Sequence, residues 1–106
     1  MGFFGFTQTR DINAGVRSFL STKGALLIDV RTPEEYAEGH IKESVNVPLQ
    51  NIEILEKIID DKSTPVFVYC RSGARSARAT DILKKMGFFN AEDIGGIMSY
   101  RGEVVR

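Results

Sequence analysis

The sequence is 106 residues long, carries 14 basic and 14 acidic side chains, and has a formal net charge of zero. This length suits one domain that buries a hydrophobic core without disulfide or metal staples, so we expect residues 1–106 to form a single domain. The balanced charge argues against a nucleic-acid-binding protein, because such proteins usually need a basic excess to offset phosphate.

Residues 1–6 are apolar, but the segment is too short for a secretory signal and lacks the charged start of one. No apolar stretch approaches the roughly 20 residues of a membrane span. We therefore expect a cytoplasmic protein with no membrane contact. For residues 1–6 themselves we expect a strand on the edge of a sheet, with a partner or dimer contact as the alternative.

The first expected elements are a helix over residues 9–20, capped by Thr9, and a buried strand over residues 25–28. The strand ends in the polar sequence Asp29-Val30-Arg31, so its end carries a carboxylate. The apolar side chains assigned to one face of the helix are Ile12, Val16, Phe19 and Leu20.

A second, short helix is expected to start at Thr32, because a cap, a proline and two acidic residues follow one another there. Gly39 ends this helix. A short strand over residues 44–48 and a helix over residues 51–60 come next. The apolar positions assigned to that third helix are Ile52, Ile54, Leu55, Ile58 and Ile59.

The strand formers at residues 66–69 predict a further strand, followed by a small, polar segment and a helix that ends at Gly87. A last strand is expected over residues 91–94, before a Gly95-Gly96 turn. Alternating strands and amphipathic helices predict the α/β class, with a central, mostly parallel sheet of about five strands between two layers of helices.

Cys70 falls where the working sites of parallel sheets lie, at the carboxyl end of a strand and just before a helix. Loop amides and a helix N-terminus favour negative charge there, and Arg71 and Arg75 add positive charge. Both effects favour the thiolate over the thiol. Hydroxyl hydrogen bonds are available from Ser72 and Ser76, and the neighbouring glycine lets the loop curl closely.

A lone cysteine at a strand end can also be a small buried hydrophobe, but this interpretation leaves the arginine, glycine and serine pattern unexplained. Positive charge at a helix N-terminus is unfavourable without an anion, so an anionic substrate better explains Arg75. For Arg71 the alternative is a side chain that simply points to solvent. One cysteine (Cys70) and one histidine (His40) permit no intramolecular disulfide and predict no metal site.

The segment CRSGARS at residues 70–76 resembles the active-site loop of single-domain rhodaneses. Upstream, DVR at 29–31 followed by EEY at 34–36, then GHI at 39–41 and NVP at 46–48, is similar to the family's signature in order and spacing. The Gly95-Gly96 pair matches its C-terminal end. The resemblance runs from about Gly24 to Tyr100, and the combination of motifs makes it specific. Tyr100 stands where many members carry tryptophan, which changes packing.

The resemblance implies a rhodanese-like three-layer fold and a sulfurtransferase that forms a persulfide on Cys70. Its donor would be thiosulfate, a persulfide or a polysulfide, and its acceptor cyanide or a thiol. No metal or organic cofactor is implied. The expected partners are a small anionic sulfur donor and a thiol or protein acceptor, and we expect a monomer or weak dimer. The residues expected to bind substrate are Arg71, Ser72, Gly73, Ala74, Arg75 and Ser76.

By the same resemblance, Asp29 and Arg31 lie at a neighbouring strand end and brace the loop region without taking part in catalysis. Asp29 is also a candidate partner for a loop arginine. His40 could in principle act as a general base, but the resemblance assigns it a role in packing or hydrogen bonding.

Two other functions compete with sulfur transfer. Phosphatases of the same fold place five residues between cysteine and arginine, whereas four separate Cys70 from Arg75 here, and the tighter loop disfavours phosphate. An arsenate reductase of this fold is a related alternative. A non-enzymatic interaction module is the other, but such modules commonly lose the cysteine or degrade the loop.

Overall fold

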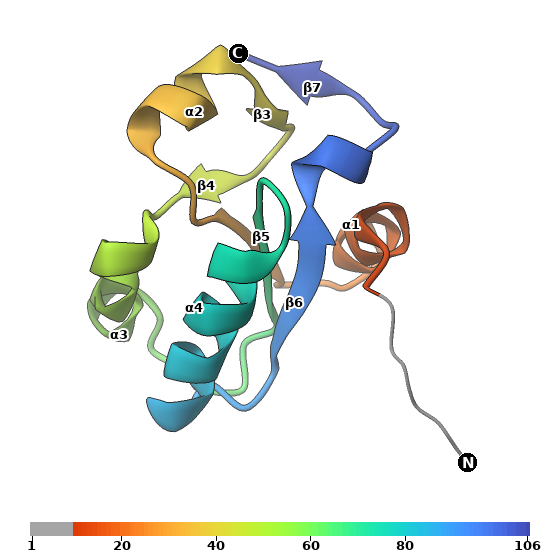
Figure 1. The fold of residues 1–106 in the computed structure, drawn as a ribbon. Coiled ribbons are helices and arrows are strands. Elements are labelled where there is room, and N and C mark those ends of the chain that lie inside the picture. Colours follow the sequence, from red (N-terminus) through yellow and green to blue (C-terminus); the bar gives the residue numbers. More distant parts are fainter. Residues whose placement is uncertain (1–9) are drawn as a thin grey trace.

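Residues 10–106 are described by a computed structural model, in which parallel strands form a central sheet with helices on both faces (Figure 1). The predicted α/β class and parallel sheet are confirmed. The expected edge strand at residues 1–6 lies outside the described residues. The four strands of the described sheet are, in spatial order, β4 (Val45–Asn46), β2 (Leu26–Asp29), β5 (Val66–Cys70) and β6 (Ala91–Gly96).

The strand β5 is the best buried of the sheet, because all five of its residues lie below the surface. It pairs with β2 on one side and β6 on the other, with Ile28 opposite Val68 and Cys70 opposite Gly96. A continuous apolar run suits a strand that is covered on both faces. Its carboxyl end, with Cys70, therefore lies between two neighbouring strand ends.

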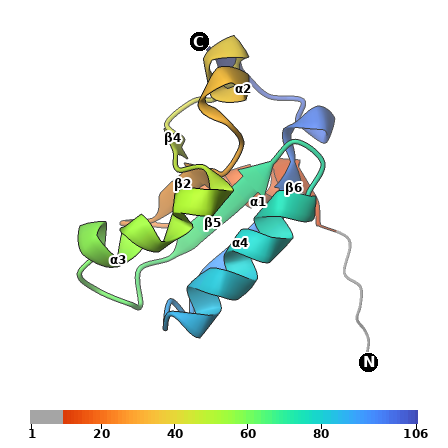
Figure 2. The same ribbon diagram turned by 60° about the vertical axis from the view of Figure 1, so that its left-hand side comes forward.

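Alternate strand residues enter two separate cores. Leu27, Phe67 and Tyr69 pack against α1 (Ile12–Leu20), and Ile28, Val68 and Cys70 belong to the core of the opposite face. That opposite face is covered by η1 (Leu49–Ile54), α3 (Leu55–Ile58) and α4 (Ala74–Lys85) (Figure 2). The strand ends are therefore packed on both faces, which gives a site at their carboxyl edge support from two layers.

The helix α2 (Pro33–Glu38) starts as the sequence predicts. The Thr32 hydroxyl accepts the Glu35 N–H, while the Glu35 carboxylate accepts the Thr32 N–H at 2.9 Å. The helix ends at Gly39. It is followed by β3 (His40–Ile41), which pairs antiparallel with β7 (Val104–Val105) as a small ribbon beside the main sheet.

The first helix ends at Leu20 as predicted but differs from its prediction at its start and in one of its buried residues. It begins at Ile12, because Asp11 caps it by accepting the Asn13 N–H at 3.0 Å. The predicted cap, Thr9, lies outside the described residues. Leu20 was expected on the buried face but is 65% exposed. A residue next to Phe19 is rotated by about 100° around the helix, so only one of the two can face the core.

The predicted helix over residues 51–60 is also wrong in part. Residues Leu49–Ile54 form a 3₁₀ helix, η1, and only Leu55–Ile58 continue as a turn of α-helix, α3. A 3₁₀ helix repeats every three residues, so Leu49, Ile52 and Leu55 face the core. Ile54 is consequently exposed rather than buried, and Ile58, the last residue of α3, is exposed as well.

The last strand, β6, is two residues longer than expected, so Gly95 and Gly96 end the strand instead of forming a separate turn. The chain then continues into the short 3₁₀ helix η2 (Ile97–Ser99). None of the helices between residues 10 and 106 is long and apolar enough to cross a membrane.

Candidate active site

Cys70 is the last residue of β5 and is 1% exposed. After a three-residue loop, α4 begins at Ala74 with Gly73 as its cap. Gly73 has a φ of 110°, a conformation that favours glycine, and its N–H donates to the Cys70 Sγ at 3.0 Å. The loop and the helix N-terminus thus bring a backbone donor and the positive end of the helix dipole to the sulfur.

Ser76, in the first turn of α4, is fully buried beside the sulfur. Its Oγ lies 3.4 Å from the Cys70 Sγ, 3.1 Å from the Gly73 carbonyl oxygen and 2.7 Å from the Asp93 Oδ1. A serine hydroxyl has one proton to donate, so these groups compete for it. Ser76 is therefore in direct contact with the thiol, as expected of a loop hydroxyl.

Asp93 is a residue of this cluster that the sequence analysis missed. It belongs to β6, and its Oδ2 lies 2.7 Å from Nη1 of Arg10, whose side chain is 47% exposed. Asp93 itself is nearly buried, with 9% of its side chain exposed. Aspartate is depleted in strands, so an Asp in the middle of a predicted strand was the available signal.

Arg75 is held by a carboxylate from another element. Its Nη1 and Nη2 donate to Oε1 and Oε2 of Glu35 at 2.8 and 3.0 Å. Hydrogen bonds from Arg75 are the main reason that the pKa of Glu35 is lowered to about 2, and the same pairing raises the pKa of Arg75. In this structure the anion that accompanies Arg75 is therefore Glu35, a partner that the sequence analysis did not foresee.

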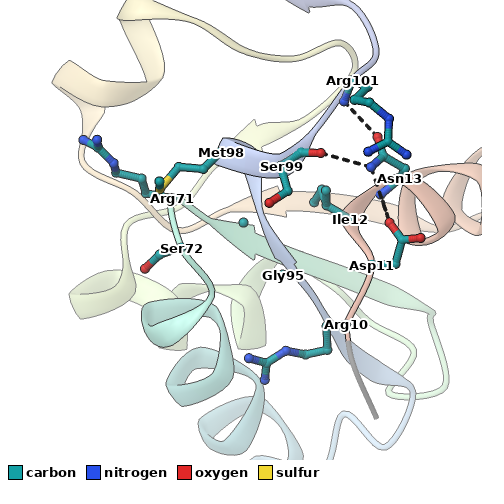
Figure 3. A pocket seen from close by; sticks show the side chains of 11 residues that line it. Arg10, Asp11, Ile12, Asn13, Arg71, Ser72, Gly95, Met98, Ser99 and Arg101 are labelled. Carbon is teal, nitrogen blue, oxygen red and sulfur yellow. Dashed lines mark hydrogen bonds between the residues drawn. The ribbon is translucent and has the colours of Figure 1, made fainter. Parts of the chain in front are cut away.

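Arg71 and Ser72 are exposed on the outer flank of the loop, where they line a pocket of about 870 Å³ (Figure 3). Met98 lies beside Arg71 at one end of the pocket, and its N–H donates to the Arg71 carbonyl oxygen at 3.1 Å. Arg101 lies at the other end. The pocket walls carry three arginines against the single carboxylate of Asp11. Because Arg10 is paired with Asp93, the positive charge that suits an anion next to the loop comes mainly from Arg71 and Arg101. Ala74, the remaining loop position predicted to bind substrate, is exposed as the first residue of α4.

Asp29 and Arg31 are buried at the end of β2 and bind each other. The Arg31 Nη2 donates to Asp29 Oδ2 at 2.7 Å and to the Gly39 carbonyl oxygen at 2.7 Å. The suggested pairing of Asp29 with a loop arginine is therefore wrong, since Arg31 occupies both carboxylate oxygens. The pair ties β2 to the turn after α2, and its guanidinium lies 5.9 Å from the ring centre of Tyr69, next to Cys70.

His40 lies in contact with Tyr36 and not with the sulfur. Their rings stack with centroids 3.6 Å apart, and the His40 Nδ1 lies 2.8 Å from the Tyr36 carbonyl oxygen. This is the packing and hydrogen-bonding role that the sequence analysis assigned to it. Within residues 10–106, no three His, Cys, Asp or Glu side chains gather closely enough to hold a metal ion.

Comparisons with known proteins identify the family of the chain. The sequence profile of the rhodanese-like domain family matches residues 13–103. Thiosulfate sulfurtransferase PspE of Escherichia coli is 39% identical over 71 residues, which are 66% of this chain and 68% of that protein. A putative mitochondrial thiosulfate sulfurtransferase of Schizosaccharomyces pombe is 43% identical over 86 residues, 70% of this chain and 61% of that protein. The matches thus span only about two thirds of these relatives.

Solved structures of rhodanese and rhodanese-related proteins are similar to this chain in fold and in sequence. A rhodanese with anions from E. coli superimposes with a TM-score of 0.72 at 35% identity, covering 77% of this chain and 98% of that one. A rhodanese-related protein from Thermoplasma volcanium has a TM-score of 0.72 at 33% identity and covers 92% of this chain and 98% of that one.

Proposed function

Because the chain belongs to the family of rhodanese-like domains, we propose that it is a sulfurtransferase that carries a sulfane sulfur as a persulfide on Cys70. The observation that supports this most directly is the surroundings of the sulfur. Sγ accepts the Gly73 N–H at 3.0 Å and lies at the N-terminus of α4. These contacts stabilise negative charge on sulfur, which the nucleophile needs.

The proposed reaction has two steps, written here for thiosulfate and cyanide. The Cys70 thiolate attacks the outer sulfur of thiosulfate, the sulfur–sulfur bond of the donor breaks, and sulfite leaves with the bonding electrons. The persulfide carries its negative charge on the outer sulfur. Cyanide then attacks that sulfur, thiocyanate leaves, and the Cys70 thiolate is regenerated. Neither step needs a cofactor.

Donor binding is proposed for residues 71–76. The loop amides would surround the transferred sulfur, and the guanidinium groups of Arg71 and Arg75 would attract an anionic donor. The pocket on the flank of Arg71 supports this assignment through its excess of positive charge. Asp29 and Arg31 would act indirectly, by fixing the end of β2 beside the strand that carries Cys70.

The identity of the partners is a separate proposal. A small anionic donor such as thiosulfate, a polysulfide or a persulfide suits the positive charge of the exposed Arg71 and of the half-buried Arg75. As acceptor we propose a thiol, either small or on a protein, because the single cysteine of the chain leaves no internal thiol to take the sulfur. We propose that the protein works as a monomer or weak dimer.

Intact-protein mass spectrometry tests the proposed function. The protein is exposed briefly to thiosulfate or polysulfide without reductant and then to cyanide. We expect a mass gain of one sulfur atom, removed by cyanide with release of thiocyanate. Cys70→Ser, with an unchanged circular dichroism spectrum, should show neither event. A folded protein with a reactive thiol that gains no sulfur from either donor would refute the proposal.

A further inference from the structure

The hydroxyl of Ser76 lies between two groups that both gain from its proton. Asp93 Oδ1 is 2.7 Å away and Cys70 Sγ is 3.4 Å away. When Cys70 is a thiol, both contacts are satisfied at once: the S–H donates to Ser76 Oγ, and the Ser76 O–H donates to Asp93. When the sulfur is a thiolate, it has no proton to donate and itself needs a donor. The Gly73 carbonyl oxygen, 3.1 Å from Ser76 Oγ, is a neutral competitor in both states, so ionisation of Cys70 adds a second anion to the acceptors of the hydroxyl proton.

Asp93 can lose the hydrogen bond from Ser76 at a low cost in free energy. Its Oδ1 also accepts the Gly95 N–H at 3.0 Å, so this oxygen stays satisfied without the serine. Its Oδ2 faces the Arg10 guanidinium at 2.7 Å. Arg10 offsets the carboxylate charge, although Oδ2 accepts no well-aligned hydrogen bond from the described residues. Each oxygen of Asp93 therefore keeps a favourable contact when the serine hydroxyl turns to the sulfur.

We propose that Asp93 is a positioning residue for Cys70: it holds the Ser76 hydroxyl proton while the cysteine is a thiol and yields it to the sulfur when the sulfur is charged. Ionisation releases one proton from Sγ to solvent, and the serine proton only changes its acceptor, so no proton passes to Asp93. The inference rests on the proposed function in taking Cys70 as the nucleophile. Through this exchange, the Asp93 charge sets how readily the thiolate forms.

Other charged side chains on the neighbouring elements remain the same in the test, and one of them, Arg75, interacts electrostatically with Cys70. They come from the loop, α4, β2 and α2. These groups are Arg71, Arg75, Asp29, Arg31 and Glu35. The test must therefore separate an effect of Asp93 that passes through the Ser76 hydroxyl from a direct effect of its charge. A double-mutant cycle makes this separation.

The measurement is the rate of alkylation by iodoacetamide as a function of pH, which reports on Cys70 alone because the chain has one cysteine. Asp93→Asn should lower the pH midpoint by about one unit, the equivalent of one hydrogen bond to a charged group. Ser76→Ala should raise the midpoint. In the Ser76→Ala background, Asp93→Asn should shift it by less than half as much. Asp81→Asn, on the exposed side of α4, is the matched control and should leave it unchanged.

Arg10→Met provides a second test at a half-exposed side chain that can be removed without a core defect. Without its counter-ion, Asp93 should hold the hydroxyl more strongly, so the midpoint should rise, and this rise should also shrink when Ser76 is alanine. Arg17→Met, an exposed arginine of α1, is its control. Shifts of equal size with and without Ser76, or no shift from either variant in the parent protein, would overturn the inference.

Sulfur loading from thiosulfate is measured on the same samples. Alkylation needs no sulfur donor, so the two proposals fail separately. A coupled Asp93–Ser76 effect on alkylation in a protein that never gains sulfur would refute the proposed function and leave this inference standing. Normal sulfur loading with no Ser76-dependent shift would refute this inference alone.

Discussion

At the scale of single residues, the guanidinium of Arg75 has two anionic partners, the Glu35 carboxylate and the proposed sulfur donor. In the structure it binds Glu35 through both terminal nitrogens, and in the proposed reaction it also attracts the donor. One guanidinium has enough donors for both, since Arg carries five N–H groups. The Glu35 carboxylate then orients Arg75 beside the loop and lowers the charge that a donor meets there.

We expect Arg75→Ala to raise the KM for thiosulfate about tenfold, the loss of one hydrogen bond to a charged group, with a smaller change in kcat. Steady-state thiocyanate formation measures both constants. Arg78→Ala, one turn further along α4 and exposed, is the control for general loss of positive charge. If the thiosulfate KM of Arg75→Ala equals that of the parent protein, Arg75 serves only to hold Glu35.

The Arg75–Glu35 pair should also make stability depend on pH. The folded-state pKa of Glu35 is about 2, below its ordinary value of 4.5, so the pair stabilises the fold above pH 4.5 and this contribution is lost as pH falls toward 2. The pair is partly exposed, so we expect only about 1 kcal/mol. Urea unfolding of Glu35→Gln should show that deficit at pH 7 and none near pH 2.

Glutamine keeps the capping interaction with Thr32, so this variant removes the charge without removing the cap. Glu34→Gln, the exposed neighbour in the same turn, is the control. A deficit of the same size at pH 7 and near pH 2 would mean that Glu35 stabilises α2 through its cap and not through Arg75.

At the scale of elements, the loop that carries the site is fitted against the end of β6. A Cβ atom at Gly96 would overlap the backbone of Arg71 and Ser72. Gly96 has a φ of −125°, which any residue adopts, so the close approach and not the backbone conformation requires glycine here. The two strand ends can therefore touch only because this position has no side chain.

We expect Gly96→Ala to displace the loop, to lower the free energy of unfolding by about 1–3 kcal/mol, and to reduce sulfur transfer more than tenfold where the protein is still folded. Gly24→Ala is a suitable control. Its φ of 80° makes alanine strained, but no atom lies near the added Cβ, and Gly24 is far from the loop in sequence. Equal turnover in these two folded variants would contradict the proposed fit.

Elements that depend on local sequence signals could be predicted, whereas contacts between distant elements could not. The apolar run before Cys70, the Thr32 capping box and the Gly73 turn are local signals, and each predicted its element correctly. The partners of the loop were not predictable in this way. Glu35 lies 40 residues before Arg75, and Asp93 lies 17 residues after Ser76, so only the folded chain brings them together. The 3₁₀ helix at Leu49–Ile54 was missed because its three-residue spacing was interpreted as α-helical.

At the scale of the whole molecule, Cys70, the proposed nucleophile, lies at the end of the most deeply covered strand. Both neighbours of β5 are paired with it along its length, and each of its faces meets a separate hydrophobic core. By contrast, the β3–β7 ribbon consists of two residue pairs beside the main sheet. Local stability should therefore be highest in β5, the strand that ends at Cys70.

Native-state hydrogen exchange can test this distribution. Amides of β5 should exchange only through global unfolding, because their opening exposes both cores, whereas those of β3 should exchange through a local opening of lower free energy. Adding urea should accelerate exchange in β5 with the full slope of global unfolding and change β3 little. If β5 exchanged as readily as β3, the strand end would not be a rigid support. The short contacts of Cys70, Gly73 and Ser76 would then not persist long enough to hold a thiolate ready for sulfur transfer.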